Sequence, residues 1–182
     1  MKVEAVDIIE RVEGPTLWVS PMVATRKPKQ SGEIQLGIDM RLPNLAIKCE
    51  RHLTPTVDDI ICEITGSRWF SKMDLRLRYH QIMLAPESRH VTTFSTHLGI
   101  RRYKCLNIGI LSAAEVFQDL IWEVLVGLEG VLNISDDILV HALTLEEHLV
   151  QLKTVFLRLQ DSGLTLHLEK CEFLKSEIRF LG

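Results

Sequence analysis

The chain has 182 residues, a formal net charge of −3 and an apolar fraction of 46%, which is the composition of an ordinary globular protein. This charge excludes nucleic-acid binding through bulk positive charge, and no apolar run reaches the roughly 18 residues of a membrane span, so no membrane contact is expected. The acidic start is unlike a signal peptide and favours an intracellular protein. The four cysteines show no C-x-x-C spacing, which favours reduced thiols over a structural zinc site.

The first half of the chain predicts a short helix, a strand and a hairpin. The segment TVDDIICEITG places Thr56 at a helix N-cap, isoleucines on one side and Gly66 at the end. The segment WFSKMDL predicts a strand around Asp74. The segment VTTFSTHLGIRRYKCL predicts a β-hairpin that turns near Leu98 and Gly99.

The second half predicts two longer helices on either side of an apolar hairpin. SAAEVFQDLIWEVLVGLEG has capping-box spacing at Ser112 and Glu115, and TLEEHLVQLKTVFLRLQDSG has it at Thr144 and Glu147. Between them VLNI and ILVHA predict a tight hairpin, and LTLHLEKCEFL predicts a last strand. The expected apolar stripes are Val116, Phe117, Leu120, Ile121, Val124, Leu125 and Leu128 in the first helix, and Leu145, Leu149, Leu152, Phe156 and Leu159 in the second. This order predicts an α+β fold, with an antiparallel sheet and helices packed on one face.

Two adjacent acidic pairs need different explanations. Asp136 and Asp137 interrupt the apolar run VLNISDDILV, and because burying an unpaired carboxylate is costly, they must lie at a solvated turn or face a cation. At the tip of the predicted hairpin both interpretations are open. Asp58 and Asp59 fall in the first turn after Thr56, where negative charge complements the helix dipole, so no catalytic role is expected for them.

Local basic clusters are the remaining candidates for nucleic-acid contact. They are Arg26 to Lys29, Arg76 with Arg78, and Arg101 to Lys104, where a tyrosine is interleaved. Taken alone, each is more typical of a solvated turn or an edge strand.

An ordered set of motifs covers almost the whole chain. It consists of WFSKMDLRLRYHQIMLAPESRHVTTFSTHLGIRRYKCL, followed by SAAEVFQ, NISDDILV, TLEEHL and GLTLHLEKCEF, with VEGPTLWVSPMV, IDMRLPNLAI and RHLTPTVDDI upstream. In this order the motifs resemble the reverse transcriptase of gypsy-type LTR retrotransposons. The resemblance implies a right-hand polymerase fold, with a fingers subdomain at 1–50 and 82–112 and a palm subdomain at 51–81 and 113–182. The family's thumb, connection and ribonuclease H domains are expected in the full polyprotein and not in these residues.

The resemblance implies two-metal nucleotidyl transfer by an RNA-directed DNA polymerase. The primer 3′-hydroxyl attacks the α-phosphate of a deoxynucleoside triphosphate on an RNA or DNA template, while two ions, Mg²⁺ or Mn²⁺, hold the attacking and leaving oxygens. Asp74, Asp136 and Asp137 match the metal-binding aspartates, and the Leu75 carbonyl can complete a metal shell. Asp74 lies 62 positions before Asp136 (136 minus 74), so only a folded sheet can bring them together.

Five further positions match secondary roles in the family. Tyr79 matches the aromatic residue that floors the sugar pocket, and Lys27 matches the fingers lysine that reaches the triphosphate. Gly109 and Gln118 belong to the segment that supports the templating base and the nucleotide. Lys170 falls where the family has a lysine that protonates the pyrophosphate leaving group. Apart from the resemblance, Tyr79 is typical of a core aromatic and Lys170 of a surface lysine on an edge strand.

Two positions depart from the family pattern at the nucleotide pocket. Gln35 stands where the family has an arginine that binds the triphosphate, and a glutamine lacks both the charge and the bidentate grip. Losing such a contact is worth about 1.5–3 kcal/mol, which is a tenfold to hundredfold loss in nucleotide handling. Arg78 replaces a small residue beside Tyr79, and it either compensates for Gln35 or blocks the pocket.

Two hypotheses follow from the sequence. The first is an enzyme, the fingers and palm of a reverse transcriptase that holds its two-metal centre. The second is a non-catalytic retroelement-derived relic that keeps only the fold, or binds nucleic acid or protein. The three aspartates are expected under both, whereas Gln35 and Arg78 favour the second.

Overall fold

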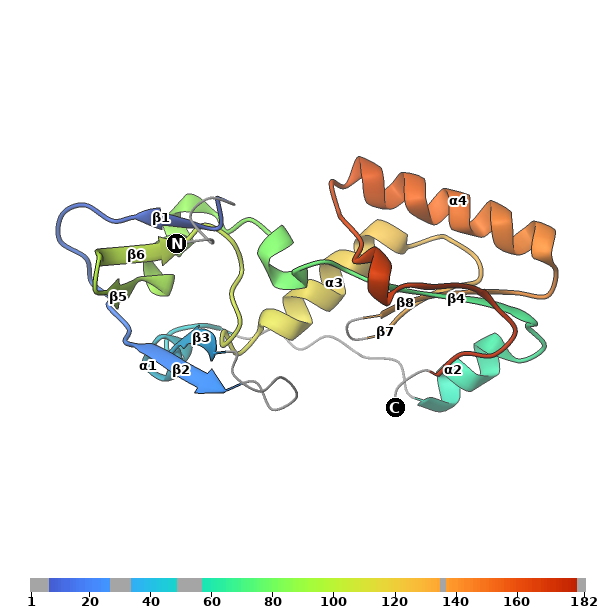
Figure 1. The fold of residues 1–182 in the computed structure, drawn as a ribbon, viewed down its shortest axis with the longest axis horizontal. Coiled ribbons are helices and arrows are strands. Elements are labelled where there is room, and N and C mark those ends of the chain that lie inside the picture. The colour runs from blue at the N-terminus through green and yellow to red at the C-terminus, as the bar shows by residue number, and fades with distance from the viewer. Residues whose placement is uncertain (1–6, 27–33, 49–56, 135–136, 180–182) are drawn as a thin grey trace. The chain divides into compact units, whose positions relative to one another are not determined.

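The computed structural model describes residues 7–26, 34–48, 57–134 and 137–179 (Figure 1). The chain divides into two compact units, each assembled from two stretches of sequence. Unit 1 comprises residues 1–50 and 79–113, and unit 2 comprises residues 51–78 and 114–182. Among the described helices, none combines the length and the apolar character that a membrane crossing needs.

Unit 1 contains two small antiparallel sheets. One sheet has the strand order β1 (Ile9–Arg11), β6 (Gly99–Tyr103) and β5 (Phe94–Thr96), and the other pairs β2 (Met22–Arg26) with β3 (Ile34–Ile38). The short helical elements are α1 (Arg41–Asn44), η1 (Arg78–Gln81) and η2 (Pro86–Thr92). The predicted hairpin is confirmed as β5 and β6, and Gly99 at its turn has a φ of +101°, a conformation that suits glycine.

One apolar cluster joins the two sheets of unit 1. Its buried members are Ile8, Ile9 and Phe94, with Met22, Ile38 and Tyr103 packed against them. The rings of Phe94 and Tyr103 lie 5.5 Å apart between centroids. The small sheets therefore share one core, which neither of them could supply alone.

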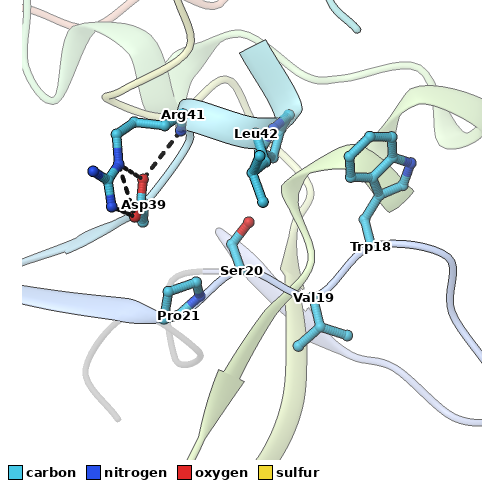
Figure 2. Close-up of a pocket in the computed structure, with 8 residues that line it drawn as sticks. Trp18, Val19, Ser20, Pro21, Asp39, Arg41 and Leu42 are labelled. Atoms are coloured by element: carbon cyan, nitrogen blue, oxygen red, sulfur yellow. Dashed lines mark hydrogen bonds and ion pairs between the residues drawn. The ribbon is translucent and has the colours of Figure 1, made fainter. Parts of the chain in front are cut away.

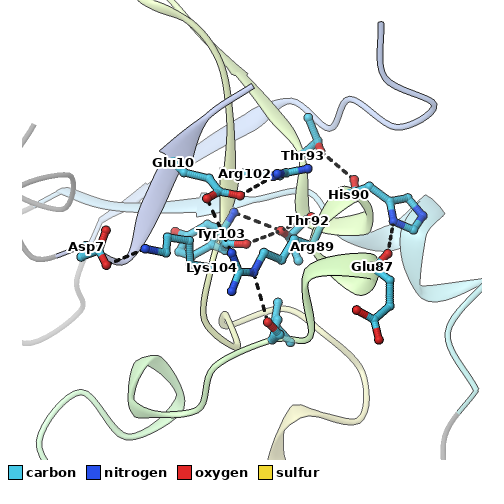
Figure 3. A network of polar contacts seen from close by, with 11 residues as sticks. Asp7, Glu10, Glu87, Arg89, His90, Thr92, Thr93, Arg102, Tyr103 and Lys104 are labelled. Carbon is cyan, nitrogen blue, oxygen red and sulfur yellow. Dashed lines mark hydrogen bonds and ion pairs between the residues drawn. The ribbon is translucent and has the colours of Figure 1, made fainter. Parts of the chain in front are cut away.

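The basic segment RRYK is held inside unit 1 by acidic partners (Figure 3). Arg102 Nε donates to Glu10 Oε1 at 2.5 Å, and Lys104 Nζ donates to Asp7 Oδ2 at 2.5 Å. The third basic residue, Arg101, is only 8% exposed. The charges of this segment are buried or paired within the unit, and its contact with nucleic acid stays a prediction.

Unit 2 is built on one four-stranded antiparallel sheet. Its order is β7 (Val131–Ile134), β8 (Asp137–Ala142), β4 (Trp69–Asp74) and β9 (Glu172–Lys175). The predicted hairpin of VLNI and ILVHA is confirmed by the pairing of β7 with β8. The central strand β8 contributes three side chains that are no more than 1% exposed, which are Ile138, Leu139 and Val140.

The α-helices in the described part of unit 2 are α2 (Val57–Ile64), α3 (Ala113–Leu125), whose first residue belongs to unit 1, and α4 (Leu145–Asp161). All three were predicted, and α4 begins at the predicted capping box. Thr144 Oγ1 accepts from Glu147 N at 3.3 Å, and Glu147 Oε2 accepts from Thr144 N at 3.2 Å. Two orphan N–H groups are thereby satisfied at the helix start.

The predicted apolar stripes are partly wrong. Val116 of α3 is 41% exposed, and Leu149 and Phe156 of α4 are 48% and 40% exposed. The buried face of α4 instead consists of His148, Leu152, Val155 and Leu159. His148 therefore occupies the core position that the apolar pattern had assigned to Leu149.

Helices cover both faces of the sheet. His148 of α4 hydrogen-bonds Ser71 at 2.7 Å between Nε2 and Oγ, so α4 lies on the face that carries Ser71 and its partner Val140. Neighbouring strand residues face opposite ways, so Leu139 points to the other side, where it packs with Ile60 of α2. The sequence indicated the antiparallel sheet and α2 but not the placement of α2 on this second face.

The last predicted strand is only partly a strand. Leu166 forms an isolated bridge with Leu75, and a 3-10 turn, η3 (Leu168–Lys170), separates it from β9. Lys170 therefore lies in a turn and not on the edge strand expected for a surface lysine.

Candidate carboxylate site

Two of the predicted aspartates meet on neighbouring strands of unit 2. Asp74 is the last residue of β4 and Asp137 is the first of β8, and they are directly paired in the antiparallel register. Directly paired residues project from the same face of a sheet. Their side chains are 25% and 22% exposed, so both carboxylates are partly desolvated.

Each of these carboxylates has a lysine partner. Lys72 Nζ lies 2.8 Å from Asp137 Oδ2, and Lys170 Nζ lies 3.6 Å from Asp74 Oδ2. Lys72 is 22% exposed, whereas Lys170 is 61% exposed. The first contact is therefore a close and partly buried ion pair, and the second is a longer, more solvated one that contributes less to stability.

The end of β4 is fixed by the segment 165–167. His167 N donates to Asp74 O at 2.8 Å, and Arg76 N donates to Thr165 O at 2.9 Å. These two bonds form the bridge between Leu75 and Leu166 without using the Leu75 carbonyl. That carbonyl is therefore directed away from residues 165–167, as a role in a metal shell requires.

Cys171 lies beside the same backbone. Burial, followed by the charges of Asp74 and Asp137, raises the pKa of the Cys171 thiol. Its Sγ–H donates to the carbonyl of His167 at 3.4 Å. Cys171 is therefore a protonated, hydrogen-bonded thiol at neutral pH.

Gln118 connects helix α3 to strand β7. Its Nε2 donates to Asn133 O at 3.1 Å, and Asn133 Nδ2 donates to Gln118 O at 3.1 Å. This reciprocal pair fixes the strand that leads into the hairpin carrying Asp137. The observed contacts thus give Gln118 a positioning role within unit 2, and its predicted contact with the templating base stays a prediction.

Gly109 belongs to a loop of unit 1 that Asn44 holds from both sides. Asn44 Nδ2 donates to Gly109 O at 2.9 Å, and Leu111 N donates to Asn44 Oδ1 at 3.0 Å. Gly109 has a φ of +106°, and a Cβ there would lie 3.2 Å from Met40 Cγ. The loop therefore requires glycine at this position for both backbone and packing reasons.

We expect Asn44→Ala to destabilise the protein by about 1–2 kcal/mol, because it removes two hydrogen bonds that each contribute roughly 0.5–1.5 kcal/mol. Urea unfolding of the 182-residue chain measures the loss. Asn44→Asp is the matched control, since it keeps the acceptor for Leu111 and loses only the donor to Gly109, and it should cost about half as much. Equal stability of wild type and Asn44→Ala would contradict the assignment.

Unit 1 has a pocket of about 450 Å³ that is lined in part by α1, the helix that contains Asn44 (Figure 2). It is lined by Trp18, Val19, Ser20, Pro21, Asp39, Arg41, Leu42 and Pro43. Arg41 grips Asp39 through Nη2 at 2.6 Å and Nε at 2.9 Å, and this contact lowers the pKa of Asp39 to about 2. The Arg41 charge is therefore already matched by a carboxylate.

The other predicted residues are placed as follows. Lys27 and Asp136 lie outside the described residues. Gln35 lies in β3, paired with Thr25 of β2. Arg78 is half-buried at the start of η1, and Tyr79 is 9% exposed in the next position, where unit 1 resumes. Their predicted roles toward a nucleotide stay predictions.

Asp74 and Asp137, the two predicted metal ligands that the structure describes, have the oxygen chemistry that a divalent ion prefers. Within the described ranges, no three histidine, cysteine or acidic side chains converge as a metal-binding group, and the third predicted ligand, Asp136, is not among them. Mg²⁺ at nucleotide sites is commonly held by one or two carboxylates together with substrate phosphates. Asp74 and Asp137 supply oxygen ligands of this kind.

Three residues at these sites were missed from the sequence. Lys72 could have been found from strand periodicity, because it precedes Asp74 by two residues and therefore shares its face. Asn133 could have been found as a lone amide in the apolar run VLNI. Asn44 gives no local signal, because its partners lie 65 and 67 positions away.

The comparisons with known proteins agree on one family. Residues 26–182 match the family described as reverse transcriptase (RNA-dependent DNA polymerase). The chain is 36% identical over 169 residues to the retrovirus-related Pol polyprotein from transposon 297 of Drosophila melanogaster, covering 91% of this chain and 16% of that protein. It is 30% identical over 157 residues to the transposon Tf2-3 polyprotein of Schizosaccharomyces pombe, covering 85% of this chain and 12% of that protein.

Solved structures show the same fold. The foamy viral protease-reverse transcriptase in complex with double-stranded DNA superposes with a TM-score of 0.87 at 22% identity, over 99% of this chain and 31% of that chain. The same viral protein in complex with an RNA/DNA hybrid gives a TM-score of 0.86 at 21% identity, over 99% of this chain and 24% of that chain. The chain thus spans only a small part of each of these proteins.

Proposed function

Because this chain belongs to the reverse transcriptase family, we propose that it is the fingers and palm of an RNA-directed DNA polymerase from a gypsy-type LTR retrotransposon. Unit 1 corresponds to the fingers and unit 2 to the palm in this proposal. The observation that carries it is the direct pairing of Asp74 with Asp137 at one end of the palm sheet. Family membership supports the reaction class, and this pairing supports the location of its centre.

The proposed reaction transfers a deoxynucleotide to a primer 3′-hydroxyl. Bound Mg²⁺ or Mn²⁺ ions would supply charge neutralisation at the attacking and leaving oxygens. Asp74, Asp136 and Asp137 would hold two such ions, with the Leu75 carbonyl oriented to assist. Lys170, whose ammonium lies 3.6 Å from Asp74 Oδ2, would donate a proton to the pyrophosphate leaving group.

The proposed partners are a primer annealed to an RNA or DNA template, and deoxynucleoside triphosphates. The structural relatives were solved with double-stranded DNA and with an RNA/DNA hybrid, which supports nucleic acid as the partner class. Tyr79 would exclude a 2′-hydroxyl, Lys27 would contact the triphosphate, and Gly109 and Gln118 would support the nucleotide and the template. Thumb, connection and ribonuclease H domains of the full polyprotein would complete the enzyme.

A non-catalytic relic is the second candidate function. Gln35 lacks the guanidinium expected at the triphosphate, and Arg78 adds a long cation beside Tyr79. Under this alternative both changes would weaken nucleotide handling without disturbing the sheet that carries the aspartates. Under this alternative the chain binds a primer–template hybrid in a salt-dependent manner and does not extend the primer.

We expect primer extension by the 182-residue chain to be weak, and the double variant Gln35→Arg with Arg78→Gly to raise it by roughly tenfold to hundredfold. The gain follows from restoring one charged triphosphate contact and removing a bulky neighbour. Extension is measured on a poly-ribonucleotide template with Mg²⁺ or Mn²⁺.

Arg76→Gly is the matched control for this double variant, because it removes an exposed arginine two positions away, and we expect no gain from it. Hybrid binding is measured on the same samples as a function of salt. Binding without extension in wild type and in the double variant alike would support the relic and overturn the polymerase proposal.

A further inference from the structure

Lys72 lies on the same face of the sheet as Asp74 and Asp137, and these three residues form the carboxylate cluster. Lys72 and Asp74 are two residues apart on β4, so both project from the face that carries Asp137. Lys72 is paired with Leu139, which places Asp137 at the diagonal position, within reach of a long side chain. The sheet register therefore brings one ammonium and two carboxylates to the same end of one face.

The two ion pairs of the cluster differ in strength. The Lys72–Asp137 contact measures 2.8 Å, and both side chains are 22% exposed. The Lys170–Asp74 contact measures 3.6 Å, and Lys170 is 61% exposed. A short, partly desolvated contact is a charge-assisted hydrogen bond, whereas a longer solvated one is readily exchanged for water or another cation. Asp74 is thus the more available of the two carboxylates.

An ammonium in this position opposes a divalent ion in two ways. Its hydrogen bond occupies a lone pair of Asp137 Oδ2 that a metal would need. Its positive charge also repels a cation bound at Asp74, on the same face and only two residues along the strand. Removing Lys72 should therefore strengthen metal binding, although removing a structural ion pair ordinarily weakens a site.

We propose that Lys72 is an internal counter-cation, which forms an ion pair with Asp137 and competes with the divalent ion for the Asp137 carboxylate. This proposal rests on the metal centre proposed above and assigns unequal roles within it. Asp74, whose contact with Lys170 is longer and more solvated, is the carboxylate more available to the ion, and Asp137 is the carboxylate whose charge Lys72 already balances. Lys72 acts through Asp137 and is a positioning residue for the reaction.

The test is Mn²⁺ affinity, measured by electron paramagnetic resonance of free Mn²⁺ with the full 182-residue chain. We expect Lys72→Met to tighten Mn²⁺ binding by about tenfold, because it frees an oxygen of Asp137 and removes a positive charge beside the ion. Lys72→Arg keeps the positive charge and should stay near wild type. The gain should be smaller in Lys72→Met combined with Asp137→Asn, measured against Asp137→Asn alone, because the carboxylate that Lys72→Met releases is then absent and only the relief of repulsion at Asp74 remains.

The possible outcomes distinguish failure of the proposed role of Lys72 from failure of the proposed metal centre. Mn²⁺ binding that Asp74→Asn abolishes but Lys72→Met leaves unchanged or weakens would overturn the role of Lys72 and leave the metal centre standing. Mn²⁺ binding that does not depend on Asp74 in any variant would overturn the metal centre and the role of Lys72 together. Thermal unfolding with and without Mn²⁺ on the same samples shows that each variant is folded, and saturating Mn²⁺ should stabilise Lys72→Met more than wild type.

Discussion

The free energy of unfolding is expected to fall as the pH is lowered from about 6.5 to 5, because two buried histidines must be neutral in the folded protein. His148 is 0% exposed and His141 is 6% exposed. Burial lowers the pKa of both imidazoles below the ordinary value of 6.5. His148 hydrogen-bonds Ser71, and His141 Nδ1 hydrogen-bonds Ser67 at 2.9 Å.

The direction follows from proton uptake. Because the pKa of these histidines is lowered in the folded state, the unfolded chain binds more protons than the folded chain below about pH 6.5. The stabilising contribution is therefore complete above 6.5 and is lost as the pH falls below it, by up to about 1.4 kcal/mol per pH unit for each histidine. The charge of Glu63 favours protonation of His141, so His148 should contribute the larger share.

Urea unfolding between pH 7.5 and 5 measures this dependence above the range in which most carboxylates titrate. His148→Gln removes the titrating group and keeps a side chain able to bond Ser71, and it should reduce the slope of the pH dependence. His97→Gln, at the exposed turn of the β5–β6 hairpin, is the matched control and should leave the slope unchanged. A slope unaffected by His148→Gln would show that His148 is not held neutral in the folded state.

His148 also shows where pattern analysis of a helix falls short. The capping box and the extent of α4 were predictable, since both depend on residues within one helix. The buried face was misplaced because an apolar count assigns the core to Leu149, whereas Ser71 on β4 offers His148 a hydrogen-bond partner. A polar side chain enters a core when its partner is present, and that partner is 77 positions away in sequence.

The same limit applies to charge. RRYK is an isolated basic segment in the sequence, but Glu10 and Asp7, its partners, precede Arg102 and Lys104 by 92 and 97 positions. No local pattern predicts such pairs. Strand periodicity, in contrast, is enough to place Lys72 and Asp74 on one face, because that relation is local, although Lys72 was missed as a site residue from the sequence.

The candidate site combines both kinds of information. The strands around Asp74 and Asp137 could be predicted from composition and alternation. Their mutual register could not, because hydrophobic pattern specifies which face a strand buries and not which strand lies next to it. The resemblance to a known family supplied the expectation that these aspartates meet, and the β4–β8 pairing places Asp74 opposite Asp137.

Replacing Asp74 with asparagine is expected to lower primer extension by at least about a thousandfold. Metal-based stabilisation of the transition state contributes several kcal/mol, and each 1.4 kcal/mol is a factor of ten in rate. Asparagine has nearly the same shape as aspartate but lacks the charge that a divalent ion needs. The backbone bond from His167 N to the carbonyl of residue 74 is unaffected by the substitution, so the strand end should keep its conformation.

Asp58→Asn is the matched control for this loss, since Asp58 also belongs to an adjacent pair of aspartates and is exposed in the first turn of α2. It should reduce stability slightly, by about 0.3–1 kcal/mol through the helix dipole, and leave extension unchanged. Both variants are compared in the Gln35→Arg, Arg78→Gly background, where extension is expected to be strong enough to quantify. If Asp74→Asn extends primers as well as Asp58→Asn does, the β4–β8 carboxylates are not the centre of the reaction, whatever the fold has in common with polymerases.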